Sequence, residues 1–488
     1  MPDFDLLVVG GGPGGYVAAI RAAQRGLRVG LVEKERPGGV CLNWGCIPTK
    51  AMLRSAEIFQ TLTTAADFGV YADNVRYDFA AVRQRKDGIV KQLTDGVAGL
   101  LAANGVTVIE GHARFTGPTG VEVFETGRSP IFPGGPRYAA APTATATRTI
   151  SATDVIIATG SVPARLPIPG ADLPGIITSD GAFGLTDVPA RLVVIGGSAV
   201  GAEWASLFAS FGSQVTIVEM QDTLVPLEDA DVGAALGRSF TKRGITVLTG
   251  STVESIAQAD VLRVTVAGEH ARELDADVVL VGVGRRPNTA DLGLDVAGIS
   301  TDARGFIPVD EQLRTGVEHV YAIGDVTGRA LLAHVASHQG LTAADVIAGH
   351  PAHIDYTVIP AATFTHPEIA GVGFTEAKAR AAGHDVVTAR FPFAALGRAQ
   401  TFGDTEGFVK IVAGRRHREV LGVHIIGPSA SDLITEGALA ISLEATLDEL
   451  ADTIHAHPTL GEIGMEAALA GLGLPVHIAP SKRRGDLS

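Results

Sequence analysis

The chain has 488 residues, and its 53 Asp and Glu against 39 Lys and Arg give a formal net charge of −14. This length predicts about three domains, and the 60 glycines follow no fixed period, which excludes a collagen-like chain and favours tight backbone turns. The negative field repels phosphate backbones and acidic lipid headgroups, so we expect neither nucleic acid nor a membrane as a partner.

The first predicted element is a dinucleotide-binding unit at the N-terminus. An apolar strand, 5–9, runs into the glycine-rich loop 10–15, an Ala-rich helix through Ala23 and a second strand, 28–32, followed by Glu33. Glycines in such a loop let the backbone approach a pyrophosphate, the helix offers free N–H groups, and the carboxylate accepts the ribose hydroxyls. The spacing therefore predicts a nucleotide site.

The segment 39–50 carries the only two cysteines, Cys41 and Cys46. Their spacing allows a disulfide across about one turn of helix. A four-thiolate zinc site is excluded, a mixed Cys/His site has little support, and two unlinked core cysteines remain as the alternative. Two cysteines form at most one disulfide, which is too few to stabilise a chain of this length, so we expect the pair to be redox-active. The start shows no signal-peptide pattern, so we expect a cytoplasmic protein.

Two further elements are predicted before the middle of the chain. The helical spacing of apolar residues predicts a pair of helices over 50–66 and 80–103. Residues 117–148 alternate short strand patterns with Pro, Gly, Ala and Thr, which is typical of a hairpin with an extended surface loop. We assign no function to the loop at 128–147.

The N-terminal pattern returns 186 residues later, with a strand at 191–195, a loop at 196–201, a helix, and a strand at 214–218 followed by Glu219. In both copies the acidic residue lies 18 positions after the last glycine of the loop. Ser198 replaces the central glycine of the second loop and narrows the approach to a pyrophosphate. Two copies with matched offsets predict two bound dinucleotides.

From about Pro351 the pattern changes to strand-like runs, 408–412 and 420–426, followed by a helix near 432–444. These features predict a separate α+β domain at the end of the chain. The predicted fold class is therefore α/β, with two Rossmann-like dinucleotide-binding domains plus a C-terminal α+β domain.

A second candidate for chemistry lies in this last domain, where His457 is followed five residues later by Glu462. Thiol chemistry needs a base near the thiolate and a group that fixes the imidazole tautomer. A histidine of this kind is more often structural when taken alone. In a chain with a redox cysteine pair it becomes a candidate base.

Several segments together resemble a known family. They are the cysteine segment, the two dinucleotide loops, Val155–Gly160, Val281–Pro287, Tyr321–Asp325, Thr365–Ala370 and the segment His455–Thr459. In this order, over nearly the whole chain, they resemble the dihydrolipoamide dehydrogenases, which are flavin-dependent pyridine nucleotide–disulfide oxidoreductases. Mercuric reductase and the large thioredoxin reductases carry a further C-terminal cysteine pair, which this chain lacks. Gly461 departs from the family pattern, which usually has Ser there, and the 128–147 loop is longer than the family's hairpin.

The resemblance implies four segments: an FAD-binding domain at 1–155, an NAD-binding domain at 156–283, a second FAD-binding part at 284–350 and a dimerisation domain at 351–488. The implied FAD-binding residues are Gly10, Gly12, Gly15, Glu33, Lys50, Ala113, Thr159, Gly160, Asp325, Leu331, Leu332, Ala333 and His334. The implied NAD-binding residues are Gly196, Gly197, Ser198, Ala199, Val200, Gly201, Glu203, Glu219, Val253 and Gly284. Glu219 favours NAD because a carboxylate would repel the extra phosphate of NADP.

The resemblance also implies a reaction. Dihydrolipoamide attacks the Cys41–Cys46 disulfide at Cys41, His457 oriented by Glu462 accepts the proton, and the electrons pass through FAD to NAD. The partners implied are a second copy of the chain, as a homodimer, and the lipoyl domain and acyltransferase core of a 2-oxoacid dehydrogenase complex, or the lipoyl carrier of glycine cleavage. The alternatives are a reductase of another small disulfide or a quinone, and an inactive flavin-binding structural subunit.

Overall fold

The computed structural model describes residues 1–125, 146 and 148–479, in two compact units. The first unit comprises residues 1–165, 177–188 and 284–354, and the second comprises 166–176, 189–283 and the chain from 355 onward. Of the loop at 128–147 only Ala146 is described. Among the described helices, none combines the length and apolar character needed to cross a bilayer. The domain boundaries expected from the sequence remain a prediction.

The first unit is built on a sheet in the order β3-β2-β1-β6-β5-β4, with β17 also paired to β6. β1, β2, β3, β6 and β17 run parallel, while β5 and β4 extend the sheet beyond β6 with antiparallel pairing. The strands are β1 (Phe4–Val9), β2 (Val29–Glu33), β3 (Thr107–Glu110), β4 (His112–Phe115), β5 (Gly120–Phe124), β6 (Arg148–Ile157) and β17 (Val320–Ala322). The strand expected at 5–9 is thus confirmed as β1, at the centre of the sheet.

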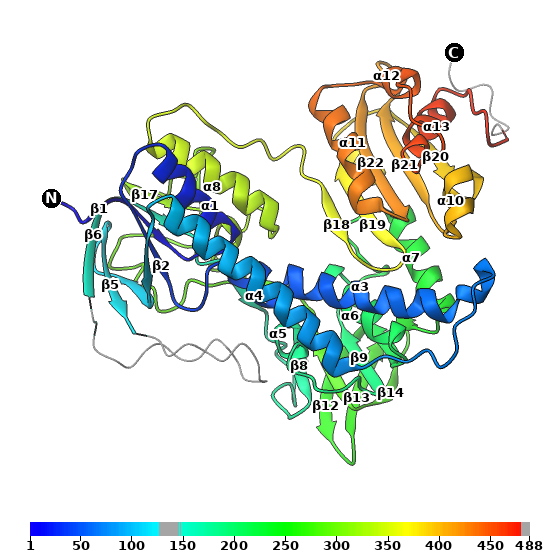
Figure 1. Cartoon of the computed structure of the whole chain (residues 1–488), viewed down its shortest axis with the longest axis horizontal. Helices are drawn as coiled ribbons and strands as arrows, with labels where there is room; N and C mark the ends of the chain where they lie inside the picture. Colours follow the sequence, from blue (N-terminus) through cyan, green and yellow to red (C-terminus); the bar gives the residue numbers. More distant parts are fainter. Residues whose placement is uncertain (126–145, 147, 480–488) are drawn as a thin grey trace. The chain divides into compact units, whose positions relative to one another are not determined.

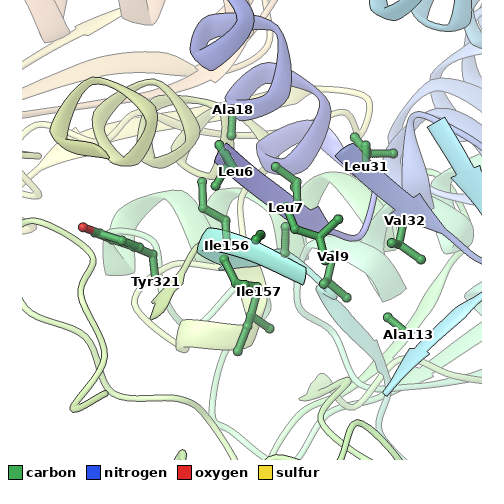
Figure 2. Packing of buried hydrophobic residues seen from close by; sticks show 14 of the residues in the cluster. Leu6, Leu7, Val9, Ala18, Leu31, Val32, Ala113, Ile156, Ile157 and Tyr321 are labelled. Carbon is green, nitrogen blue, oxygen red and sulfur yellow. The ribbon is translucent and has the colours of Figure 1, made fainter. Parts of the chain in front are cut away.

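Apolar side chains on both faces of β1 explain why it lies at the centre. Leu6, Leu7 and Val9 are buried among side chains of β2 and β6, as Figure 2 shows. Strands buried on both faces read as continuous apolar runs, as FDLLVV does here. The first glycine-rich loop therefore follows directly after a strand that is held on both faces.

Helix α1 (Pro13–Gln24) follows this loop and packs against α8 (Ala333–Ile347), beside which it runs in Figure 1. Glycines permit the approach. A Cβ on Gly340 would lie 2.5 Å from the carbonyl oxygen of Gly14, and one on Gly14 would lie 2.9 Å from that of Ala336. This packing brings the start of α8, with its predicted cofactor residues, close to α1.

The cysteine segment forms two helices, α2 (Gly39–Trp44) and α3 (Cys46–Thr63), separated by Gly45. The spacing allows a disulfide across about one turn of helix, whereas in the structure each cysteine lies on its own helix. A Cβ on Gly45 would lie 2.8 Å from the carbonyl oxygen of Val40, so the close approach of the two helices requires glycine there. α3 also begins four residues before the predicted helix at 50–66.

The predicted helical pair is present, because α3 packs against α4 (Phe79–Ala103). The remaining elements of the first unit are short. They are η1 (Ala65–Phe68), β7 (Ser161–Pro163), α5 (Ser179–Ala182), β16 (Arg285–Pro287) and η2 (Gly324–Thr327), with β8 (Ile176–Thr178) at its boundary.

The second unit contains the repeat of the N-terminal pattern as a parallel sheet in which β9 lies between β10 and β15, and β11 pairs with β10. An antiparallel sheet, β12-β13-β14, follows β11 in the chain. The elements are β9 (Arg191–Ile195), α6 (Ala199–Ser210), β10 (Gln214–Val218), α7 (Ala230–Lys242), β11 (Thr246–Leu248), β12 (Ser251–Gln258), β13 (Leu262–Gly268), β14 (Arg272–Ala276) and β15 (Val278–Val281). The second dinucleotide-binding fold is thus confirmed.

The end of the chain forms an antiparallel sheet, β18-β19-β22-β21-β20, covered by α11 and α13. Its elements are β18 (Ala361–Thr363), β19 (Glu368–Gly373), α9 (Glu376–Ala381), β20 (Val386–Pro392), η3 (Phe393–Ala395), α10 (Gly397–Phe402), β21 (Phe408–Gly414), β22 (Val420–Gly427), α11 (Ala430–Ser442), α12 (Leu447–Asp452) and α13 (Glu462–Gly471). The predicted α+β domain is confirmed, and its helix near 432–444 is α11.

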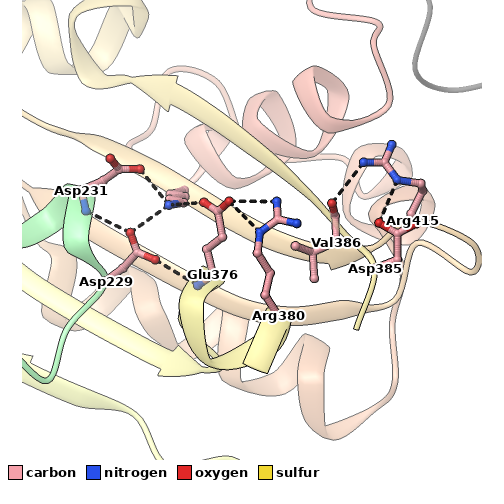
Figure 3. A network of polar contacts seen from close by, with 8 residues as sticks. Asp229, Asp231, Glu376, Arg380, Asp385, Val386 and Arg415 are labelled. Atoms are coloured by element: carbon pink, nitrogen blue, oxygen red, sulfur yellow. Dashed lines mark hydrogen bonds and ion pairs between the residues drawn. The ribbon is translucent and has the colours of Figure 1, made fainter. Parts of the chain in front are cut away.

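A buried lysine joins the two parts of the second unit. Lys410 in β21 lies 2.9 Å from Asp229, which caps α7, 2.7 Å from Asp231 and 3.0 Å from Glu376 in α9. Figure 3 shows the carboxylates converging on one ammonium group. The Lys410 side chain is only 5% exposed, so these contacts are made largely out of water.

Candidate active site

The first glycine-rich loop has the shape that a pyrophosphate needs. Gly10 has φ +106°, a conformation that favours glycine, and a Cβ on Gly15 would lie 1.8 Å from the carbonyl oxygen of Gly10. A Cβ on Gly12, in contrast, would meet no atom within 4 Å. The loop is therefore closed toward the protein and open on the side where a ligand would bind.

The acidic residue at the end of each second strand is held by its own loop. Glu33 accepts the N–H of Gly11 at 2.6 Å and of Glu35 at 2.7 Å. Burial raises the pKa of Glu33, and these two N–H groups oppose that rise. The carboxylate therefore lies ready beside the loop that would hold the pyrophosphate.

The second loop repeats this arrangement. Glu219 accepts the N–H of Gly197 at 2.5 Å and of Gln221 at 2.8 Å. A Cβ on Gly201 would lie 1.9 Å from the carbonyl oxygen of Gly196, which matches the first loop. Ser198 stands at the N-cap of α6 without a side-chain capping bond. The two sites thus share one local geometry.

A third group of polar residues lies beside the end of β6. Asp325 accepts the hydroxyl of Ser161, and Arg285 donates to the same hydroxyl oxygen at 2.6 Å. Burial raises the pKa of Asp325, whereas Ser161 and Arg285 lower it. Thr159 Oγ1 is buried without a hydrogen-bond partner among the described residues. An unsatisfied buried hydroxyl two residues before Ser161, which binds the partly buried Asp325 carboxylate, fits the hydroxyl-rich part of a dinucleotide such as FAD.

Cys41 lies on α2, and Cys46 is the first residue of α3. The hydrogen bond to Cys46 and burial raise the pKa of the Cys41 thiol, while the positive charge of Lys50 lowers it. Cys46 is the more exposed of the two residues.

The candidate base lies in the second unit, in the segment between α12 and α13. His457 Nδ1 is 2.8 Å from Glu462 Oε1, and the other oxygen of Glu462 accepts the N–H of Thr459 at 2.8 Å. Burial raises the pKa of Glu462, but Thr459 and His457 outweigh it and hold that pKa below its ordinary value. With Nδ1–H donated to the carboxylate, Nε2 of the neutral ring is the free acceptor, and the His457 side chain is 76% exposed.

The other predicted cofactor residues lie at strand ends and helix starts of their units. They are Lys50 in α3, Ala113 in β4, Gly160 after β6, Leu331 and Leu332 before α8, Ala333 and His334 at its start, Ala199, Val200 and Glu203 in α6, Val253 in β12, and Gly284 after β15. Glu203 is buried and accepts the N–H of Phe364 at 2.9 Å. Their contacts with a nucleotide remain a prediction.

Three polar residues that support the site were missed by sequence reasoning. Ser161 and Arg285 hold Asp325, and the buried Gln339 accepts the N–H of Gly324 at 2.5 Å. Arg285 lies inside the motif Val281–Pro287, which was a usable signal. Nothing in the local sequence marks Ser161 or Gln339, because their partners are more than a dozen residues away.

Comparison with known proteins agrees with this geometry. Residues 4–340 match the family model described as pyridine nucleotide-disulphide oxidoreductase, and residues 359–468 match the dimerisation domain of the same family. The chain belongs to the pyridine nucleotide–disulphide oxidoreductase family. This oxidoreductase therefore uses FAD and NAD, and its last domain is a dimerisation domain.

The curated relatives of this oxidoreductase are named dihydrolipoyl dehydrogenase. The chain is 42% identical to the one from Chlamydia muridarum, covering 98% of this chain and 99% of the relative. It is 44% identical to the one from Geobacillus stearothermophilus, covering 98% of each.

Solved structures share the fold over nearly the same length. LpdA from Mycobacterium tuberculosis has a TM-score of 0.85 at 29% identity, covering 95% of this chain and 98% of that one. The HOCl-induced flavoprotein disulfide reductase RclA from Escherichia coli has a TM-score of 0.82 at 28% identity, covering 95% and 99%. The family resemblance inferred from the motifs is thus confirmed.

Proposed function

We propose that this oxidoreductase oxidises protein-bound dihydrolipoamide to lipoamide and reduces NAD to NADH. The observation that carries the proposal is the hydrogen-bonded Cys41–Cys46 pair at the start of α3, in a chain with two dinucleotide loops. The relatives named dihydrolipoyl dehydrogenase, at 41–44% identity over nearly their full length, support the same substrate.

The residues divide the work as follows. His457 Nε2 accepts a proton from one substrate thiol, and the resulting thiolate attacks Cys41 in the Cys41–Cys46 disulfide. The S–S bond breaks and Cys46 leaves as a thiolate. The second substrate thiol then attacks the substrate sulfur of the mixed disulfide, the bond to Cys41 breaks, and the proton of that thiol passes to the Cys41 sulfur. Lipoamide is released, with Cys41 left as a thiol and Cys46 as a thiolate.

The predicted cofactor residues bind the nucleotides and take no part in the thiol chemistry. Gly10, Gly12, Gly15, Glu33 and Asp325 would hold FAD, which when bound supplies the two-electron relay between the dithiol and NAD. The loop 196–201 and Glu219 would hold NAD in the same geometry. Glu219 favours NAD over NADP, since its carboxylate, which accepts two backbone N–H groups, would repel a 2′-phosphate.

We also propose the biological setting. The dimerisation domain supports a homodimer in which each site takes its base from the partner, and the substrate is a lipoyl domain of a 2-oxoacid dehydrogenase complex or of glycine cleavage. The closely spaced thiols fit a reducing compartment, the cytoplasm.

The test is Cys46→Ser, assayed with dihydrolipoamide and NAD and, in parallel, with NADH and ferricyanide. Serine cannot form the disulfide, so we expect loss of nearly all dihydrolipoamide oxidation, while NADH–ferricyanide activity stays within about two-fold because it needs only flavin and nucleotide. Dihydrolipoamide oxidation at the parental rate would refute the disulfide mechanism. Saturation with glutathione disulfide instead of dihydrolipoamide would favour the other reductase.

A further inference from the structure

His455 and Glu436 form a second imidazole–carboxylate pair, two residues before the candidate base. His455 Nε2 lies 2.8 Å from Glu436 Oε1, and Glu436 comes from α11. The His455 side chain is 11% exposed, whereas that of His457 is 76% exposed. One imidazole of this segment is therefore turned into the domain and the other outward.

Both nitrogens of the inward ring face acceptors. His455 Nδ1 lies 2.8 Å from the carbonyl oxygen of Thr453, and Nε2 faces the Glu436 carboxylate. The ring is therefore held at two points, and its contact with the carboxylate joins the segment to α11.

Two glycines, Gly461 and Gly464, lie near Glu436. A Cβ on Gly464, in the first turn of α13, would lie 3.1 Å from Glu436 Oε2. A cavity of about 20 Å³ is lined by Glu436 together with Gly461 and Gly464. A Cβ on Gly461, in contrast, would make only ordinary contacts, 3.7 Å from Thr459 Oγ1 and 3.8 Å from His455 Cδ2.

The segment that carries His457 lacks regular secondary structure between α12 and α13. Its C-terminal side is fixed by Glu462, which binds both His457 and the N–H of Thr459. Its N-terminal side has the exposed Ile454 and is fixed through His455. Thr453 is also bonded to Glu449 of α12, and Thr459 Oγ1 donates to the carbonyl oxygen of Ala456. The bond from His455 to Glu436 is the one that joins this side of the segment to α11.

We infer that His455 and Glu436 are positioning residues for His457: they fasten the segment 453–461 to α11 and so set the direction of the base. This inference rests on the proposed role of His457. A misplacement of about 1 Å can cost about 100-fold in rate, so the attachment affects the chemical step even though neither side chain touches the substrate.

The experiment compares His455→Ala with His455→Gln. Alanine removes both hydrogen bonds, and we expect kcat for dihydrolipoamide to fall about 10- to 100-fold with KM within about two-fold. The glutamine amide N–H can reach Glu436 from nearly the position of Nε2, so this variant should recover to within about five-fold of the parent. NADH–ferricyanide activity should stay parental in both.

A matched glycine pair tests the same attachment from its other end. Gly464→Ala places a methyl group against Glu436 Oε2 and should lower kcat in the same way as His455→Ala, though less. Gly461→Ala has room for its methyl group and serves as the control. Both changes add the same atoms at the start of α13, so a general effect of alanine on the helix would appear in both.

The outcomes separate this inference from the proposed function. Parental kcat in His455→Ala, equal behaviour of the two glycine variants, or no recovery in His455→Gln each overturns the positioning role. A variant that loses ferricyanide activity as strongly as dihydrolipoamide activity also counts against it. His457→Gln is measured alongside: if it keeps the parental rate, the base assignment itself fails, and if only it loses activity, the positioning inference alone is wrong.

Discussion

Single glycines decide whether each nucleotide loop can form. Gly15 and Gly201 occupy equivalent positions, and at both a Cβ would overlap a carbonyl oxygen, at 1.8 and 1.9 Å. No side-chain movement relieves a clash with backbone. The close packing of helix against loop thus requires glycine at these two positions.

Gly15→Ala and Gly201→Ala should therefore separate the two sites. Overpacking costs about 1–3 kcal/mol, which corresponds to about 5- to 150-fold in binding. We expect Gly15→Ala to purify with much less FAD, and Gly201→Ala to keep its flavin but show a KM for NAD raised within that range.

Each variant is the control for the other, with flavin absorbance and NAD saturation as the two measurements. Full flavin in Gly15→Ala, or an unchanged KM for NAD in Gly201→Ala, would contradict the assignment of that loop.

At the scale of elements, Lys410 joins β21 to α7 and α9 (Figure 3). Burial lowers the pKa of Lys410, but Asp231, Asp229 and Glu376 outweigh it and raise that pKa above its ordinary value. Burial raises the pKa of Asp229, yet Lys410 and backbone N–H groups hold it below its ordinary value. Charged Lys410 stabilises the folded state at every pH below the ordinary pKa of lysine, and ionised Asp229 does so at every pH above the ordinary pKa of aspartate. The Lys410–Asp229 pair therefore contributes its full stabilisation between about pH 5 and pH 10.

Lys410→Met should lower the free energy of unfolding of the second unit by about 3–5 kcal/mol at pH 7, because Asp229 is left buried without its cation. Urea unfolding followed by fluorescence measures the shift. The difference from the parent should shrink as the pH falls through the lowered pKa of Asp229, since a protonated carboxyl no longer needs the cation.

Lys91→Met is the control, because Lys91 pairs with Asp95 at the surface of α4 with both side chains more than half exposed. Such pairs are worth at most about 1 kcal/mol. An equal loss in the two lysine variants would show that the buried group has no special role.

At the scale of the whole molecule, the cysteines and the candidate base lie in different units, and the dimerisation domain carries the base. If each site combines the cysteines of one subunit with His457 of the other, two inactive variants can restore one working site when paired. If both come from one subunit, pairing restores nothing.

Cys46→Ser and His457→Gln are therefore to be unfolded, mixed and refolded together. Random pairing makes half of the dimers mixed, and each mixed dimer has one intact site, so we expect about a quarter of the parental dihydrolipoamide activity. Each variant refolded alone is the control. Activity no higher than in these controls would place base and cysteines in the same subunit.

The sequence by itself determined the fold class, both nucleotide loops, the cysteine pair and the candidate base. These are local patterns: strand, loop, helix and acid follow one another within about 30 residues, and the five residues from His457 to Glu462 suffice for a hydrogen bond at 2.8 Å.

Only the tertiary structure decided the contacts made over long separations. Gly45, which lies close to the Val40 carbonyl oxygen, separates the two helices that carry the cysteines. Ser161 and Arg285 bind Asp325 and each other from distant parts of the chain, and Lys410 of β21 binds Asp229 at the start of α7. His455 lies in the same sequence segment as the candidate base, but its ring contacts Glu436 on α11. Hydrogen bonds between distant residues depend on which elements pack together, and no spacing in the chain encodes that packing.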